Sequence, residues 1–325
     1  MKRIYGKDRP LGRLLAFTRS GRFPHALLFC GKKGVGRGVL ADYAAALLLC
    51  ERGGEKPCGE CIACRKVEAH IHPDVIYPLS ESENGKYTVE RLRGLIADCY
   101  KSPNDGAVRV CIFENIDEMS VLCQNTLLKF IEEPLPFNRC LFTAEKRGSV
   151  LETVRSRVTV LDVDEADREG CLAALSDHGI ERGRAEELYG LFGGNIGKCI
   201  EGADDEGKAA LMKTASEIAE ALYAGREYDC AVSFSALKTR EEIGEVLALL
   251  SDVFASALVR LSGGTTGGAL SAQSEKLAGR LRRSTASELY DAVSGLLSAL
   301  ESNPNVPLFA AHCCEKLFDT LEKGI

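Results

Sequence analysis

The sequence has 325 residues, of which 45% are apolar and 27% are charged, and its formal net charge is −6. This length allows two or three domains with a sizeable core, and the composition is that of an ordinary soluble globular protein. No run approaches the roughly 20 apolar residues that span a bilayer, and the charged N-terminus has no apolar signal segment, so we expect a cytoplasmic protein.

Five short apolar runs in the first half of the chain predict β-strands, and the stretches between them predict helices. The expected strands are His25–Cys30, Asp74–Leu79, Val108–Phe113, Arg139–Thr143 and Arg157–Asp162. The expected helices are Val39–Leu49, Thr88–Cys99 and Val121–Glu133, the last beginning after Ser120 as N-cap and ending before Pro134. Strands that alternate with helices indicate a parallel sheet with helices on both faces.

The strand signals fade after about residue 165, and the rest of the sequence has helical patterns only. Residues 166–204 predict short helices, whereas 205–325 predict longer amphipathic ones. We therefore expect three parts, which are an α/β domain of residues 1–165, a small helical domain of 166–204 and an all-helical domain of 205–325.

The segment after the first expected strand has the setting of a phosphate-binding loop. Gly31, Gly34 and Gly36 turn the chain between a strand and a helix, and Gly31 and Gly36 have the G-x4-G spacing. An intact loop of this kind continues with Lys, which reaches the phosphates, and with Ser or Thr, which holds Mg²⁺. Here those positions are Arg37 and Gly38, so the Mg²⁺ ligand is missing and the loop is degenerate.

The third expected strand ends in Glu114 and Asn115. P-loop ATPases place an acid for Mg²⁺ at this point, usually next to a Glu that activates water. Because Asn cannot accept a proton, the second site also lacks its general base. These residues predict a chain that retains the architecture of an ATPase without hydrolysing ATP.

Fourteen cysteines occur in the sequence, and four of them form the pattern C-x7-C-x2-C-x2-C. Most of the others, such as Cys30, Cys111 and Cys140, lie singly within apolar runs and are expected to be buried free thiols. The four clustered residues are Cys50, Cys58, Cys61 and Cys64. Their spacing predicts a structural zinc site with four thiolate ligands. Unconnected free cysteines and an iron–sulfur cluster are the alternatives.

Nearby, His72-Pro-Asp74 is expected to cap the entry to the next strand rather than to bind metal. Residues 1–70 hold 14 Lys and Arg against 6 Asp and Glu, so this basic part could face DNA or an acidic partner. The total negative charge argues against a protein that coats nucleic acid on its own.

Taken together, these segments resemble the delta-prime family of bacterial DNA polymerase III clamp-loader subunits, relatives of gamma/tau in the AAA+ class. The resemblance rests on Phe23–Phe29, the Gly31–Gly38 loop, the four cysteines, His72–Asp74, Gln124–Pro134 and Ser156–Val158. It covers about residues 1–165. Two departures are Val158, where the family motif Ser-Arg-Cys has Cys, and Gly197-Lys198, where gamma/tau has a nucleotide-sensing Arg.

The resemblance implies an AAA+ domain, a helical lid and a helical collar that packs into a ring with the gamma/tau and delta subunits. Such a ring opens the sliding clamp and places it on primed DNA. The resemblance also implies that Arg157 is an arginine finger for a neighbouring ATPase subunit, with Arg155 as the second candidate. It also implies that the chain is a subunit of the polymerase holoenzyme. It implies no ATP hydrolysis by the chain itself.

Two other functions are carried forward as alternatives. An active P-loop ATPase of the gamma/tau type would need Lys and Ser or Thr at positions 37 and 38, where this chain has Arg and Gly. A zinc nucleic-acid-binding module would need aromatic side chains beside the cysteines on which bases could stack. Between Cys50 and His72 the sequence has no Phe, Tyr or Trp.

Overall fold

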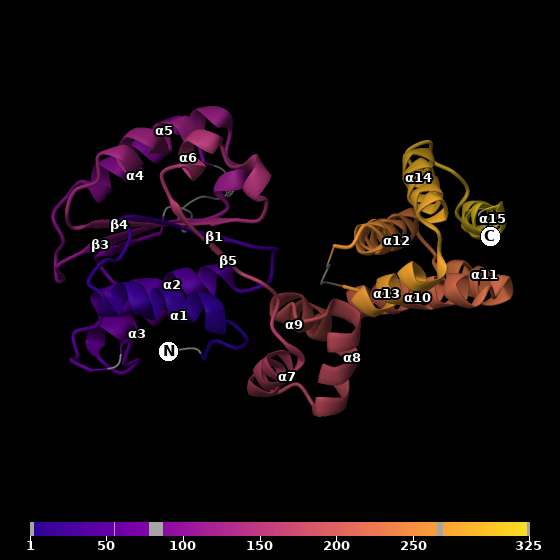
Figure 1. The fold of residues 1–325 in the computed structure, drawn as a ribbon, viewed down its shortest axis with the longest axis horizontal. Coiled ribbons are helices and arrows are strands. Elements are labelled where there is room, and N and C mark those ends of the chain that lie inside the picture. The colour runs from indigo at the N-terminus through magenta and orange to yellow at the C-terminus, as the bar shows by residue number, and fades with distance from the viewer. Residues whose placement is uncertain (1–2, 55, 78–86, 265–268, 324–325) are drawn as a thin grey trace. The chain divides into compact units, whose positions relative to one another are not determined.

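A computed structural model of the chain describes residues 3–54, 56–77, 87–264 and 269–323 (Figure 1). The chain divides into two compact units, Met1–Ala166 and Asp167–Ile325. Each unit is described by itself. The finer division of the second unit at residues 204 and 205 stays a prediction.

A parallel five-stranded sheet lies at the centre of the first unit (Figure 1). Its strands are β1 (Ala26–Cys30), β2 (Val75–Ile76), β3 (Arg109–Phe113), β4 (Asn138–Ala144) and β5 (Thr159–Asp162), in the order β2-β3-β4-β1-β5. All residues of β1 and β3 are buried, as expected for strands that are covered on both faces. The predicted parallel sheet is confirmed.

Helices cover both faces of this sheet (Figure 1). One face carries α1 (Asp8–Arg19), α2 (Arg37–Leu49) and α3 (Ile62–Glu68), and the other carries α4 (Val89–Cys99), α5 (Val121–Glu132) and α6 (Glu152–Arg155). Successive residues of a strand point to opposite faces. Accordingly, Leu27 and Phe29 join the core under α1 to α3, whereas Ala26 and Leu28 join the core under α4 to α6.

Several predicted boundaries hold, and some elements were not predicted. Ser120 caps α5 by accepting a hydrogen bond from the backbone N–H of Cys123, and the helix ends before Pro134. Helices α1, α3 and α6 have no counterpart among the expected elements. The prediction that the fifth strand begins at Arg157 is wrong, because the N–H of Arg157 bonds the carbonyl of Val154 in a turn.

The second expected strand is shorter than predicted within the described residues. It begins at Val75, and residues 78 and 79 of the expected strand lie outside the described part of the chain. His72 explains the later start, because its Nδ1 accepts the backbone N–H of Asp74 at 3.1 Å. The predicted capping role of His72-Pro-Asp74 is therefore confirmed.

In the second unit the described residues form helices and connecting loops without a strand. The first three helices, α7 (Arg168–Asp177), α8 (Arg182–Phe192) and α9 (Ile196–Asp204), pack against one another. The others are α10 (Glu206–Ala224), α11 (Glu227–Ser235), α12 (Arg240–Leu261), α13 (Ser271–Arg280), α14 (Arg283–Leu300) and α15 (Val306–Lys323). Leu247, Leu250 and Phe254 lie on one buried face of α12. Within the described ranges no helix combines the length and apolar character needed to cross a bilayer.

Candidate metal centre and phosphate loop

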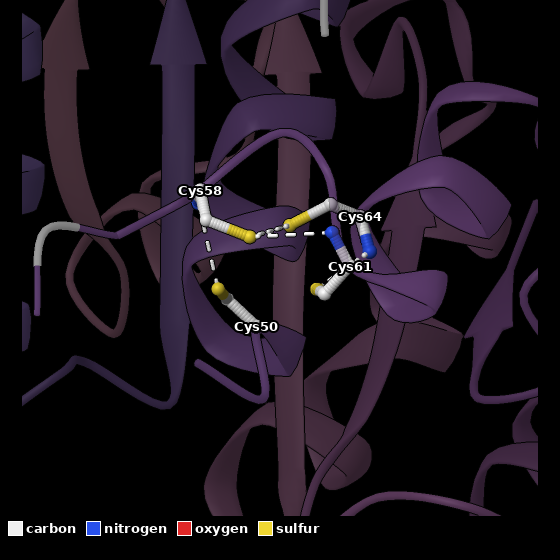
Figure 2. Close-up of side chains that lie close together, drawn as sticks. All are labelled: Cys50, Cys58, Cys61 and Cys64. Atoms are coloured by element: carbon white, nitrogen blue, oxygen red, sulfur yellow. Dashed lines mark hydrogen bonds between the residues drawn. The ribbon is translucent and has the colours of Figure 1, made fainter. Parts of the chain in front are cut away.

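The four clustered cysteines point toward one another around α3 and the loop before it (Figure 2). Cys50 follows α2, Cys58 lies in the next loop, Cys61 is the N-cap of α3 and Cys64 lies in its first turn. All four Sγ atoms lie within 4.8 Å of one another. Four sulfurs at about 2.3 Å from a zinc ion are separated by about 3.8 Å in a tetrahedron, so a small contraction brings this cluster to metal-binding geometry.

Backbone hydrogen bonds hold the loop in this shape. Each of three successive N–H groups donates to the sulfur of the preceding cysteine in the cluster: Cys58 to Cys50 at 3.5 Å, Cys61 to Cys58 at 3.3 Å and Cys64 to Cys61 at 3.4 Å. Gly59 has a φ of 74°, which glycine adopts without strain. These hydrogen bonds and Gly59 shape the turns that bring the four cysteines together.

The surroundings of the sulfurs differ. The backbone N–H groups of Glu60 and Cys61 lower the pKa of the Cys58 thiol to about 6, whereas burial raises the pKa of the Cys64 thiol. Metals bind thiolates, so metal binding at this cluster is expected to release protons. Four sulfur donors fit a closed structural site. The cluster can hold a metal ion.

A buried charge pair supports the sheet beside this centre. Asp74 accepts backbone N–H groups from Asn104 at 2.5 Å and from Asp105 and Gly106 at 2.8 Å. Its side chain is fully buried and lies 3.4 Å from the guanidinium of Arg109. Lys66 on α3 pairs with Asp105 at 2.9 Å. The loop that binds Asp74 therefore also contacts the helix that carries Cys64.

The degenerate phosphate loop joins the end of β1 to the start of α2. Gly34 and Gly36 have backbone φ values of 89° and 92°, which residues with a side chain rarely adopt. Gly31 is required for another reason, because a Cβ there would clash with the carbonyl oxygen of Val163. The predicted glycines thus shape a tight loop that opens onto a helix N-terminus.

The structure brings the two predicted nucleotide positions together. Arg37 Nη2 donates to Asn115 Oδ1 at 3.2 Å, across the ends of β1 and β3. A Cβ at Gly38 would lie 3.4 Å from Glu114 Oε1. Arg37 and Asn115, at the motif positions of the Lys and the water-activating Glu, are therefore hydrogen-bonded to each other. The carboxylate of Glu114 lies beside position 38, where an intact loop has the hydroxyl of Ser or Thr.

Arg157 lies in the turn between α6 and β5, and its side chain is 41% exposed. Arg155 is less exposed, and its Nε is buried without a partner among the described residues. Glu132, which sequence reasoning did not single out, lies 2.7 Å from Arg157 Nε. Only its place in the Gln124–Pro134 segment drew attention to it.

Residues 7–167 match the sequence model of the family described as "DNA polymerase III, delta subunit". Over these residues the chain is similar to that family. The match covers all four clustered cysteines, the phosphate loop, Glu114, Asn115 and Arg157. The predicted family resemblance is thereby confirmed.

Curated relatives of this chain include delta' and tau subunits of DNA polymerase III. DNA polymerase III subunit delta' of Pseudomonas aeruginosa is 33% identical over 176 residues, which is 53% of each chain. The delta' subunit of Bacillus subtilis is 26% identical over 238 residues, or 70% of each chain. The tau subunit of Escherichia coli is 30% identical over 50% of this chain and 26% of its own length. The match with the Pseudomonas delta' subunit thus spans about half of that protein.

Proposed function

We propose that this chain is the delta' subunit of a bacterial DNA polymerase III clamp loader, a component that helps to load the sliding clamp on primed DNA. The family match of residues 7–167, with delta' relatives among the proteins it resembles, carries this proposal. The first unit is then an AAA+ domain that has lost the chemistry of hydrolysis.

The phosphate loop supports a non-hydrolysing role. Glycine at position 38 offers no hydroxyl for Mg²⁺, and Asn115 cannot act as a base. Arg37 is engaged by Asn115, so its charge is directed to the end of β3. An active ATPase of the gamma/tau type would need these three positions to be different, which makes it the weaker candidate.

The cysteine cluster is proposed to hold one structural zinc ion. A closed set of four thiolates leaves no coordination position for water or substrate, so the ion would stabilise the loop between α2 and α3 without taking part in a reaction. The lack of aromatic residues between Cys50 and His72 weighs against an independent nucleic-acid-binding module.

The proposed partners are the gamma/tau and delta subunits, and through the complex the sliding clamp and primed DNA. Residues 166–204 would form the lid and 205–325 the collar that packs into the ring, in the cytoplasm at the replisome. Arg157 would act in trans on ATP bound by a neighbouring subunit.

Co-purification followed by a clamp-loading assay tests the proposal. Tagged chain should capture the gamma/tau and delta subunits of its own organism, and clamp loading on primed DNA should require its addition. Isolated chain in a filter-binding assay is the comparison. Tight DNA binding by the isolated chain, without capture of the other subunits, would support the nucleic-acid-binding module instead.

A further inference from the structure

The guanidinium of Arg157 is fixed by three contacts. Its Nε lies 2.7 Å from Glu132 Oε1, and its Nη1 donates to the carbonyl oxygen of Thr153 at 2.9 Å and to Ser156 Oγ at 3.1 Å. Among the described residues no partner is found for Nη2. The side chain is therefore oriented while one of its donor nitrogens stays open to an incoming group.

Both ends of this arrangement stand on the core. Glu132 is the last residue of α5, directly after the buried residues Phe130 and Ile131. The backbone N–H of Arg157 bonds the carbonyl of Val154, whose side chain is fully buried. A side chain held by rigid elements has already lost much of the rotamer freedom that binding would otherwise cost.

We propose that Glu132 is a positioning residue that holds Arg157 so that Nη2 faces the phosphoryl group of ATP bound to a neighbouring subunit. This inference rests on the proposed function. Guanidinium binds phosphate through fixed, planar N–H groups, so its orientation determines how well it stabilises the developing charge. Glu132 fixes the Nε side and leaves Nη2 for the phosphate.

The size of the effect follows from the exposure of the pair. The side chains of Arg157 and Glu132 are 41% and 45% exposed, so solvent weakens their attraction. Exposed ion pairs contribute at most about 1 kcal/mol, which corresponds to a change in rate of about fivefold. Loss of Glu132 should therefore reduce the turnover number by about two- to fivefold, less than loss of Arg157 itself.

The test uses the reconstituted clamp loader with clamp and primed DNA, and measures kcat and KM for ATP. Glu132→Ala should lower kcat with little change in KM, because the finger acts in the transition state. Glu132→Gln should retain most activity, since its amide oxygen still accepts from Nε. Glu133→Ala is the matched control on the same helix end and should behave as wild type. Zinc content and incorporation into the complex are measured for every variant.

A double variant separates positioning from other effects. In an Arg157→Ala background, Glu132→Ala should cause no further loss, because the group it positions is absent. An equal loss in both backgrounds would overturn the inference. If Arg157→Ala lowers turnover and Glu132→Ala does not, the positioning role of Glu132 is wrong, while the arginine-finger role of Arg157 is retained. If Arg157→Ala leaves turnover unchanged, the finger itself is wrong and the role of Glu132 falls with it.

Discussion

At the scale of single residues, the cysteine cluster gives the most direct prediction. Purified chain should contain about one zinc ion, and Cys61→Ser should lower its zinc content because a serine hydroxyl is a poor replacement for a thiolate ligand. The loop between α2 and α3 should also become more sensitive to protease, since metal binding and local folding are coupled. Elemental analysis of the purified proteins measures the first effect.

Cys123→Ser is the control for this experiment. Cys123 is buried outside the cluster, and its Sγ lies 3.4 Å from the carbonyl oxygen of Tyr87, a contact that a hydroxyl can also make. Its zinc content should equal that of the wild type. Iron in place of zinc, or no metal at all, would contradict the proposed zinc site.

Asp74 gives the second prediction, which concerns stability. Asp74→Asn should lower the free energy of unfolding by about 3 kcal/mol, because it leaves the buried Arg109 without its counter-charge. Urea unfolding followed by circular dichroism measures the change. The matched control is Asp105→Asn, which breaks a half-exposed pair with Lys66 and should cost less than about 1 kcal/mol. Equal losses in the two variants would show that burial of the pair is unimportant.

The same carboxylate makes stability depend on pH. Burial alone raises the pKa of Asp74, but the backbone N–H groups of Asn104, Asp105 and Gly106, together with Arg109, bring the pKa below its ordinary value. A carboxylate with a lowered pKa stabilises the fold fully above its unfolded pKa of about 4, and this contribution is lost as pH falls further. The stability difference between wild type and Asp74→Asn should therefore be constant near neutral pH and shrink below about pH 4.

At the scale of elements, the sequence predicted those strands and helix ends that depend on residues close together along the chain. Apolar runs located the five strands, and Ser120 and Pro134 located the ends of α5. Helix α3 has only seven residues and depends on the cysteine loop before it, so no periodic pattern marks it. The turn at Arg157 was mistaken for strand because Val158 continues the apolar pattern of β5.

The phosphate loop shows where sequence reasoning stops. The unusual residues at positions 37, 38, 114 and 115 could be recognised by comparison with an intact motif. Their mutual contacts could not, because the Arg37–Asn115 bond joins residues 78 positions apart and depends on where β1 and β3 end. Asp74 and Arg109 are similar, since their pairing follows from the register of β2 and β3.

This arrangement predicts that restoring one residue does not restore hydrolysis. Gly38→Ser should leave the purified chain without ATP turnover, because the new hydroxyl would lie against Glu114 and Asn115 still provides no base. Phosphate release, measured before and after size-exclusion chromatography, tests this. Turnover that follows the protein through the column, in the variant or in the wild type, would contradict the proposed loss of hydrolysis.

At the scale of the whole molecule, the two units differ in what they can contribute. The first contains the cysteine cluster, the degenerate loop and Arg157, whereas the described residues of the second offer helices only. If the chain does not hydrolyse ATP, as proposed, presenting Arg157 to a neighbouring subunit would account for its retention of an ATPase-like domain. The proposed activity would then belong to the complex rather than to the isolated chain.

The two arginines around Ser156 make this assignment testable. Arg157→Ala should fold, retain zinc and join the complex, yet strongly reduce ATP hydrolysis stimulated by clamp and DNA, because a trans-acting arginine is worth roughly 10³–10⁵ in rate at the site it serves. Arg155→Ala should affect turnover much less, since the Nε of Arg155 is buried within its own unit. Steady-state phosphate release by the two reconstituted complexes distinguishes them. Normal turnover and clamp loading with Arg157→Ala, or a greater loss with Arg155→Ala, would show that the finger has been assigned to the wrong residue.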